Sequence, residues 1–320
     1  MSTSLCQYPM WIGVLTLVLS IISLCTGTSF AKTLFSEVGA VGTTTFRIFF
    51  SACILWLIWR PWRIPVTRSD LATIVPYGIC IVGMNLPFYL ALQTLPVGIA
   101  LAIEFTGPLS LAIYKSRTRF DFLWIAFAMV GLYLLLWPNS DSGELIALDL
   151  AGVTYAIIAG AFWAAYIIFG QSARRVHPGH VTSYGLTIAA MLILPFGLIS
   201  GGANMFNTNL LLFGLAIAVL SSALPYSLEV FALRILPAKT FSIMLSLEPA
   251  VGALAGIIIL GEVIESKQWI AILLVVSASA GCTATAVRDN RREKAKKKPK
   301  SLTNSNVNVF LSLPYLRITF

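Results

Sequence analysis

Apolar residues run in long stretches from about residue 10 to residue 287, and short polar connections separate them. An α-helix needs about 20 predominantly apolar residues to cross the hydrocarbon core of a bilayer. The pattern predicts ten transmembrane helices, at residues 10–29, 42–59, 71–92, 96–114, 120–138, 149–170, 181–200, 209–232, 238–260 and 267–286. We therefore expect an all-α polytopic membrane protein, with no soluble domain between its spans.

Basic residues are concentrated in alternate connections between these stretches. Of the 22 Lys and Arg residues, all but Lys32, Arg47 and Lys267 lie in those connections or in the tail after the last span. Loops rich in Lys and Arg stay on the cytoplasmic side of a membrane, so both termini are expected in the cytoplasm. A missed or false span would scramble the alternation, and the charges therefore also favour the count of ten.

Composition agrees with a membrane protein. Hydrophobic residues make up 58% of the chain and charged residues 11%, whereas soluble domains have about 25% charged residues. The net charge of +9 comes mainly from eight basic residues between Arg288 and Lys300. We expect residues 288–320 to form a disordered cytoplasmic tail, either a topogenic anchor or a binder of anionic lipid. Nucleic acid is not an expected partner, because no folded domain carries a basic face.

An internal repeat relates the two halves of the chain. The sequence ALQTLP at 91–96 matches ALRILP at 232–237, and Leu-Pro opens a related stretch in each half, 95–108 and 236–249. The repeat predicts two five-helix units, residues 10–138 and 149–287. Because five is odd, the second unit must enter the bilayer from the opposite side, which is typical of alternating-access transporters. A duplication kept for packing alone is the alternative.

Four ionisable residues fall inside predicted spans: Arg47, Glu104, Glu229 and Glu248. Each costs about 2.5–3.5 kcal/mol on insertion scales, so such residues usually serve a function. Glu104 and Glu248 lie near mid-membrane and are too short to reach an interface. Our hypothesis is that one holds the ammonium of a substrate while the other exchanges a proton. Arg47 and Glu229 lie closer to an interface, where snorkelling is an alternative, and an acid that neutralises Arg47 is another.

Four prolines interrupt the predicted spans near these acids. A proline removes a helical hydrogen bond, and the freed carbonyl at membrane depth needs a partner or a wet cavity. We expect helix breaks at Pro87, Pro108, Pro225 and Pro249, with simple kinks as the alternative. Polar groups beside the prolines are Asn85 and Tyr226; Asn85 and Arg47 are the expected donors to a substrate carboxylate.

Aromatic, cysteine and histidine residues complete the candidate chemistry. Tyr89 and Trp163 are expected to line a cavity, although anchoring at the membrane interface explains most membrane Trp and Tyr. The odd number of cysteines and the two histidines of one short loop, His177 and His180, do not indicate a metal site. No phosphate-binding loop is present, so we expect no cofactor and coupling to an ion gradient instead of ATP.

Several motifs resemble a known family. AFWAAY at 161–166, LDLAG at 148–152 and LGEVIESKQWIA at 260–271 are similar to the EamA domains of the drug/metabolite transporter superfamily. More narrowly, residues 83–109 and 223–250 resemble bacterial inner-membrane exporters of threonine and homoserine. The resemblance covers about residues 10–287 and implies export of small amino acids, driven by the proton motive force, from a bacterial inner membrane. The basic tail departs from the family pattern.

Two other functions stay open at this point. EamA domains carry many substrates, so a broader metabolite or drug exporter is the alternative within transport. A non-transporting membrane scaffold or sensor is the alternative from another class, although it would need neither deep acids nor inverted symmetry. The expected partners are the small amino-acid substrate, protons and the lipid bilayer, and the oligomeric state is open.

Reporter fusions test the predicted topology. Fusions after Lys115, Arg175 and Arg292 should report the cytoplasm, because these residues lie in or beside basic connections. Fusions after Ser140 and Ala203 should report the outside. A reversed assignment for one of the basic connections would contradict the inverted repeat.

Overall fold

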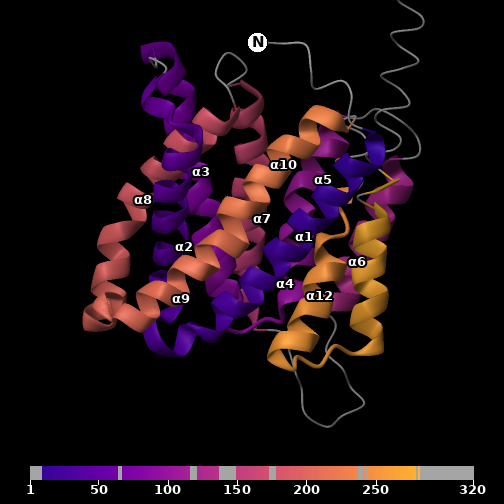
Figure 1. The fold of residues 1–320 in the computed structure, drawn as a ribbon. Helices are drawn as coiled ribbons and strands as arrows, with labels where there is room; N and C mark the ends of the chain where they lie inside the picture. Colours follow the sequence, from indigo (N-terminus) through magenta and orange to yellow (C-terminus); the bar gives the residue numbers. More distant parts are fainter. Residues whose placement is uncertain are drawn as a thin grey trace, which may run out of the picture.

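The computed structural model describes residues 9–63, 67–115, 121–136, 149–172, 178–236, 241, 244–278 and 280–281. Every regular element among them is helical (Figure 1). The helices are α1 (Met10–Thr33), α2 (Phe35–Trp59), α3 (Arg68–Ala91), α4 (Val97–Glu104), α5 (Thr106–Lys115), α6 (Asp121–Leu136), α7 (Leu150–Ser172), α8 (Pro178–Gly201), α9 (Thr208–Ala218), α10 (Leu224–Ile235) and α12 (Glu248–Ala255). A further apolar helix spans Ser266–Ala278. The predicted tail, residues 288–320, lies outside the described part.

The helices have the length and composition of membrane spans. Within the described residues, six helical stretches are long and apolar enough to cross a bilayer, and three apolar helices are shorter. Large apolar side chains such as Met191, Phe196 and Ile199 of α8 are exposed, as expected of side chains that face lipid. The class of polytopic all-α membrane protein is therefore confirmed, whereas the count of ten spans remains a prediction.

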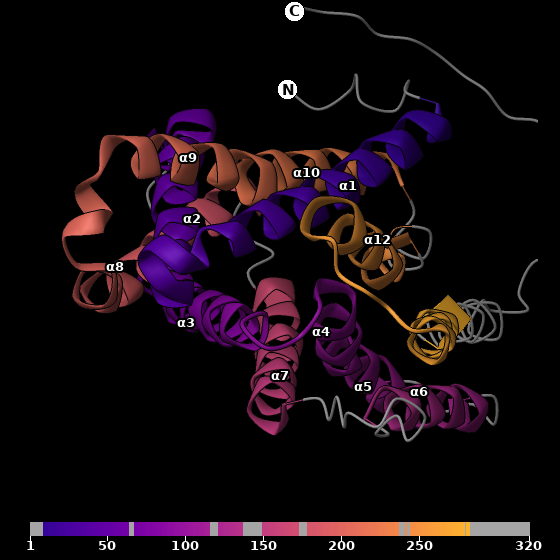
Figure 2. The ribbon, with the colours of Figure 1, turned by 90° about the horizontal axis from the view of Figure 1, so that it is seen from below.

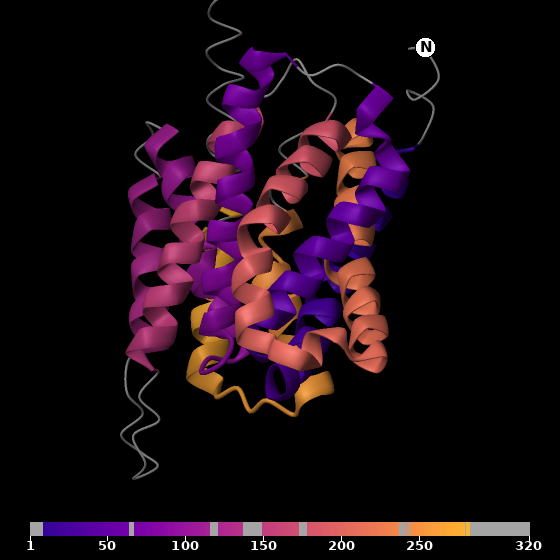
Figure 3. The same ribbon diagram turned by 90° about the vertical axis from the view of Figure 1, so that its left-hand side faces the viewer.

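Helices from the two halves of the chain pair with one another. Helix α1 packs along α10, α2 along α8, α3 along α7, and α4 against α12. In the end-on view, α1 and α10 lie on one side of the bundle, α4, α5 and α7 lie on the other, and α12 lies between them (Figure 2). The long helices run between the same two ends of the molecule (Figure 3).

Helix α4 lies in the densest part of this bundle. All eight of its residues are buried. Its crossing with α12 is close, because a Cβ at Gly98 would lie 2.4 Å from the Ala253 Cβ and a Cβ at Gly252 would lie 2.3 Å from the Leu101 Cδ1. Small residues at helix crossings let two backbones approach in a membrane, where dispersion contacts drive association. The α4–α12 contact therefore depends on its glycines.

Helix α2 differs from the predicted span. It begins at Phe35 and passes through a kink at Gly39, whose φ of 70° and ψ of 172° are not helical. A residue with a Cβ rarely adopts such a positive φ, so glycine is needed there. The expected span began at residue 42, which placed Arg47 near one end. In the structure Arg47 lies at the middle of α2, and its side chain is buried.

Candidate functional site

Two helices in the core are each interrupted by a short turn at related positions, while the backbone angles of Phe105 and Leu247 stay in the right-handed helical region. Helix α4 ends at Glu104, Phe105 forms a turn, and α5 begins at Thr106. In the second half, Ser246 and Leu247 form a turn, and α12 begins at Glu248. The sequence repeat places Phe105 and Ser246 at equivalent positions, and Pro108 and Pro249 follow each turn at equal distances. Both breaks therefore lie beside the prolines, which cannot donate a backbone hydrogen bond.

The two deep acids flank these breaks. Glu104 is the last residue of α4 and Glu248 the first residue of α12, and their exposed fractions are 5% and 4%. The charge of Glu248 interacts with those of Glu104 and Glu229, so the three carboxyl groups lie in one region. Among the described residues, neither Glu104 nor Glu248 has a side-chain hydrogen bond or an ion pair. Buried carboxylates without partners are costly, and functional sites are where proteins retain them.

Arg47 occupies the same region but does not form an ion pair with a described acid. Its Nε donates to the Ser222 Oγ at 2.9 Å, and its Nη2 donates to the Ser221 carbonyl oxygen at 3.0 Å. Its exposed fraction is 5%, so snorkelling to an interface is wrong for this side chain. The alternative that an acid neutralises Arg47 in a direct ion pair is also not seen among the described residues. Arg47 and Glu104 are close enough for an electrostatic interaction without direct contact.

Pro225 explains the position of Arg47. In a regular α-helix, the Ser221 carbonyl would accept from the backbone nitrogen of residue 225, which in proline carries no hydrogen. The helix instead forms a π-helical turn over Val219–Ala223. The Ser221 carbonyl oxygen accepts a hydrogen bond from the Arg47 side chain. Such π turns are frequent at functional sites. Pro87 behaves differently, because α3 continues through it to Ala91, and no helix break occurs there.

Helix α3 contributes two buried polar residues. The ring of Tyr89 is fully buried, and the Arg47 guanidinium lies 5.3 Å from its centroid, within the range of a cation–π contact. The Tyr89 hydroxyl has no hydrogen-bond partner among the described residues. Asn85, one helical turn earlier, donates from Nδ2 to the Ile81 carbonyl oxygen at 2.8 Å. Its second Nδ2 hydrogen and its amide oxygen remain for other partners.

The other candidates surround the acids from α7 and α10. Tyr226 interacts electrostatically with Arg47, Glu229 and Glu248. The Ser20 hydroxyl of α1 lies 3.2 Å from the Glu229 Oε1 and 3.1 Å from the Pro225 carbonyl oxygen. Because a hydroxyl has one hydrogen, it donates to one of the two oxygens at a time. Glu229 thus has a buried serine as its partner, although the sequence left snorkelling open for this acid.

Trp163 belongs to the wall of this region. Its ring packs edge-on against Phe105, with centroids 5.1 Å apart and planes at 89°. Phe105 is the residue at the α4–α5 turn, so the tryptophan covers the break beside Glu104. The geometry is that of a favourable aromatic pair, and it gives Trp163 a packing role in addition to the expected lining role.

Sequence reasoning did not identify four residues that support the site. Ser221 and Ser222 bind Arg47, Ser20 binds Glu229, and the Cys25 thiol donates to the Glu248 carbonyl oxygen at 3.6 Å. Serine and cysteine are common small residues in membrane helices and pack there without special meaning. A sequence signal existed only for Ser221 and Ser222, which directly precede the Ala-Leu-Pro of residues 223–225.

Two glycines bring α7 into backbone contact with the α4–α5 break. A Cβ at Gly107 would lie 1.9 Å from the Gly160 carbonyl oxygen, and a Cβ at Gly160 would lie 2.5 Å from the Glu104 carbonyl oxygen. That Glu104 carbonyl is the one that Pro108 leaves without its helical donor. The backbone of α7 therefore covers it, and the position of Glu104 depends on the absence of a side chain at residue 160.

Comparison with known proteins agrees with these features. Residues 150–283 match the model of the EamA-like transporter family. The threonine/homoserine exporter RhtA of Salmonella typhimurium (strain LT2) is 41% identical over 283 residues, which are 88% of this chain and 95% of that protein. The chain belongs to the EamA-like transporter family. The threonine/homoserine exporter RhtA of Escherichia coli K12 is 40% identical over 291 residues, which are 91% of this chain and 98% of that protein.

More distant matches are a transporter and a solved structure. An uncharacterized transporter of Bacillus subtilis, YwfM, is 26% identical over 250 residues, which are 73% of this chain and 83% of that protein. A solved structure aligns with a TM-score of 0.58 at 16% identity, over 87% of this chain and 97% of its own. That structure shows a common fold. The family resemblance seen in the sequence motifs is confirmed.

The glycine contact between α5 and α7 gives a stability prediction. Gly160→Ala should lower the free energy of unfolding by about 1–3 kcal/mol, as overpacking does in tightly packed interiors. Gly170→Ala on the same helix is the control, since its Cβ would meet the Tyr77 ring at 3.3 Å, where a small shift suffices. Thermal unfolding in detergent measures both variants. Equal melting temperatures for the two would contradict the backbone contact at Gly160.

Proposed function

We propose that this chain is a secondary active exporter of threonine, homoserine and related small amino acids, coupled to protons. The identity of about two residues in five with named threonine/homoserine exporters over most of both chains supports the substrate class. The observation that carries the mechanism is the grouping of Glu104, Glu248 and Arg47, all buried, near the two short turns at Phe105 and at Ser246–Leu247. Sites at discontinuous helices near the midplane are typical of secondary transporters.

The charges of this region suit a zwitterion. An amino acid brings an ammonium, which needs an acceptor with negative charge, and a carboxylate, which needs donors. Glu104 and Glu248 offer carboxyl groups that have no hydrogen bond or ion pair with another described residue. A guanidinium has five N–H donors, and Ser222 and the Ser221 carbonyl use two of those on Arg47. The remaining donors of Arg47 and the free Tyr89 hydroxyl would bind the substrate carboxylate.

Proton coupling needs an acid whose charge changes during the cycle. Two carboxyl groups in one low-dielectric region disfavour simultaneous ionisation, because like charges repel strongly there. The repulsion between the two carboxylates therefore links the binding of a substrate ammonium at one of them to the binding of a proton at the other. We assign these two tasks to Glu104 and Glu248, and Glu229, which also interacts with Glu248, would relay protons to them.

Alternating access would follow from a 5+5 inverted repeat of ten spans. If residues 10–138 and 149–287 are equivalent, α1 corresponds to α7, α2 to α8, and α3 to α9 and α10. The contacts α1–α10 and α2–α9 then correspond to α7–α3 and α8–α3, and all four pairs are in contact. The α2–α8 pair, which is also in contact, corresponds to itself. This exchange of contacts supports rocking of one half against the other around the acids.

The orientation proposed for this carrier places both termini in the cytoplasm of a bacterial cell, with the spans in the inner membrane. The alternation of basic connections supports it. The end of the bundle where α1 ends and α4 begins then faces outward. Export uses the inward proton gradient, so each cycle would bring protons inward as an amino acid leaves. A broader EamA metabolite exporter remains the alternative within the same mechanism.

Amino-acid tolerance tests the substrate class. Cells that overproduce the protein should grow in inhibitory concentrations of homoserine or threonine, because export lowers the internal concentration. Growth curves against a vector control measure this effect. No gain in tolerance to any amino acid would favour a different substrate class or a non-transporting membrane protein.

Substitution of the two acids tests the mechanism. In proteoliposomes, one of Glu104→Gln and Glu248→Gln should lose uphill transport driven by a pH gradient while it retains exchange of labelled threonine. The other should lose substrate binding, because it removes the partner of the ammonium. Glu37→Gln changes an exposed acid of α2 and should behave as the wild type. Uphill transport at wild-type rates in both variants would place the site elsewhere. Failure of both to accumulate, together with Arg47→Ala, would make the charges structural.

Arg47→Lys tests the assignment of the substrate carboxylate. Lysine keeps the charge but loses the planar fork that binds two acceptors. The loss of one charge-assisted hydrogen bond, about 1.5 kcal/mol, should raise the KM for threonine about tenfold. Transport rates at increasing threonine concentrations measure the change. An unchanged KM would show that the carboxylate binds to other donors.

A further inference from the structure

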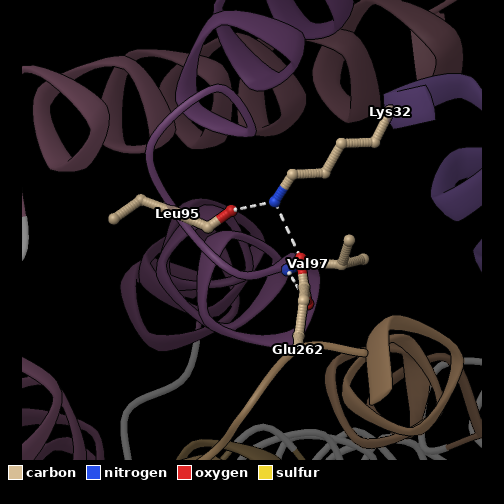
Figure 4. A network of polar contacts seen from close by, with 4 residues as sticks. All are labelled: Lys32, Leu95, Val97 and Glu262. Carbon is tan, nitrogen blue, oxygen red and sulfur yellow. Dashed lines mark hydrogen bonds and ion pairs between the residues drawn. The ribbon is translucent and has the colours of Figure 1, made fainter. Parts of the chain in front are cut away.

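A second polar cluster lies at the start of α4, away from the central acids. The Lys32 Nζ of α1 lies 2.7 Å from the Glu262 Oε1 and donates to the Leu95 carbonyl oxygen at 2.9 Å. The Val97 backbone N–H donates to the other carboxylate oxygen of Glu262 at 2.9 Å. Figure 4 shows the ammonium between Leu95 and Glu262, with Val97 beside the carboxylate. The cluster therefore joins α1, the first turn of α4 and the segment that follows the π-helical turn at Gly256–Leu260.

Both charges of the pair are well enclosed. The side-chain exposed fractions of Lys32 and Glu262 are 21% and 10%. Exposed ion pairs contribute little, but here each charged group also binds a backbone group, and Val97 is the first residue of α4, where the helix dipole favours a carboxylate. The Glu262 N–H donates to the Gly256 carbonyl oxygen, and a Cβ at Gly256 would lie 2.1 Å from the Glu262 Oε2. The absence of a side chain at Gly256 therefore leaves room for the Glu262 carboxylate.

The cluster closes one end of the path from the central acids. Helix α4 runs from Val97 at the cluster to Glu104, and α12 runs from Glu248 back toward Gly256. Eight residues of α-helix cover about 12 Å, so the cluster lies about that far from the acids. Between the two levels, α4 and α12 are in contact at Gly98 and Ala253. No residue of α4 is exposed, whereas Tyr226 and Glu229 of α10 are half-buried.

We propose that Lys32 and Glu262 are a latch that holds this end closed and must separate before substrate can leave through it. The proposal rests on the alternating-access function proposed above and adds the residues that control one of its two openings. Lys32 belongs to the first half of the chain and Glu262 to the second, so the pair ties together the two parts that must move apart. Separation costs the ion pair and the hydrogen bond from the Val97 N–H to Glu262, the two contacts of this cluster that cross between the halves, and this cost biases the empty carrier toward closure at this end.

Cys25 provides a reporter of the opening that does not depend on transport. Its thiol is 1% exposed and lies beside Glu248, at the level of the central acids. In a chain with Cys6, Cys53, Cys80 and Cys282 replaced by serine, a membrane-impermeant methanethiosulfonate reagent reaches Cys25 from the latch side only when that end opens. Labelling rates are measured in vesicles of both orientations, so that each end of the bundle is exposed to reagent in turn.

We expect Lys32→Gln and Glu262→Gln to raise the labelling rate about tenfold from the side that carries Lys32, with no rise from the other side. The exchange Lys32→Glu with Glu262→Lys should restore at least part of the slow rate. Gly256→Ala displaces the Glu262 carboxylate without a change of charge and should act like Glu262→Gln. Glu37→Gln and Gly170→Ala are the matched controls and should leave the rate unchanged.

The outcomes separate the latch from the proposed function. Unchanged labelling in the three disrupting variants, or an equal rise from both sides, would overturn the latch. If the single variants fail to fold, a folded charge-exchanged chain with slow labelling would support the pair, and an unfolded one would make it purely structural and overturn the latch. A one-sided rise in a protein that transports no amino acid would uphold the latch and refute the exporter.

Discussion

The constraint on which this structure depends is the cost of placing charge in the middle of an apolar bundle. Arg47, Glu104 and Glu248 are each about 95% buried among helices whose core is largely apolar. The molecule satisfies the arginine with a serine hydroxyl, a backbone carbonyl and an aromatic face. Among the described residues, the two carboxyl groups have no comparable partners. An uncompensated carboxyl group in such surroundings is destabilising, and a substrate ammonium or a proton relieves that cost.

Backbone irregularity makes the arrangement feasible. A continuous helix at membrane depth offers no free backbone group, because each carbonyl is already bonded. Proline removes donors at defined positions, and each freed carbonyl finds a specific environment. The Ser221 carbonyl receives Arg47, and the Glu104 carbonyl lies against Gly160. The breaks thus supply polar groups in the core and fix where the charged side chains point.

The central acids and the Lys32–Glu262 pair are connected through α4 and α12. Both helices are short, and each has one end at the acids and the other end near the pair. A rigid rotation of one of these helices would move groups at both levels at once. Close packing at Gly98, Gly252 and Gly256 makes the contact between α4 and α12 stiff. A close-packed interior has low compressibility, so it transmits small displacements. Release of the pair and rearrangement of the acids are therefore expected to be coupled.

The sequence alone determined the membrane class, the approximate positions of the long apolar helices and the identity of the buried acids. These features are local: a helix that crosses a bilayer must be apolar over its own length, and a charge within it stands out. The repeat also indicated where helices would break, as at Pro108 and Pro249. Pro87 shows the limit of that inference, because the same residue type left α3 continuous.

The tertiary structure alone decided which groups meet. Arg47 was placed near an interface because the kink at Gly39 could not be anticipated, and the depth of a residue depends on where its helix begins. Ser20, Ser221 and Ser222 carry no distinctive pattern, and they matter through contacts with residues more than 170 positions away. The same holds for Lys32 and Glu262, which the sequence placed in separate loops. Pairings across such distances depend on how the two halves pack, and a single sequence contains no local signal for that.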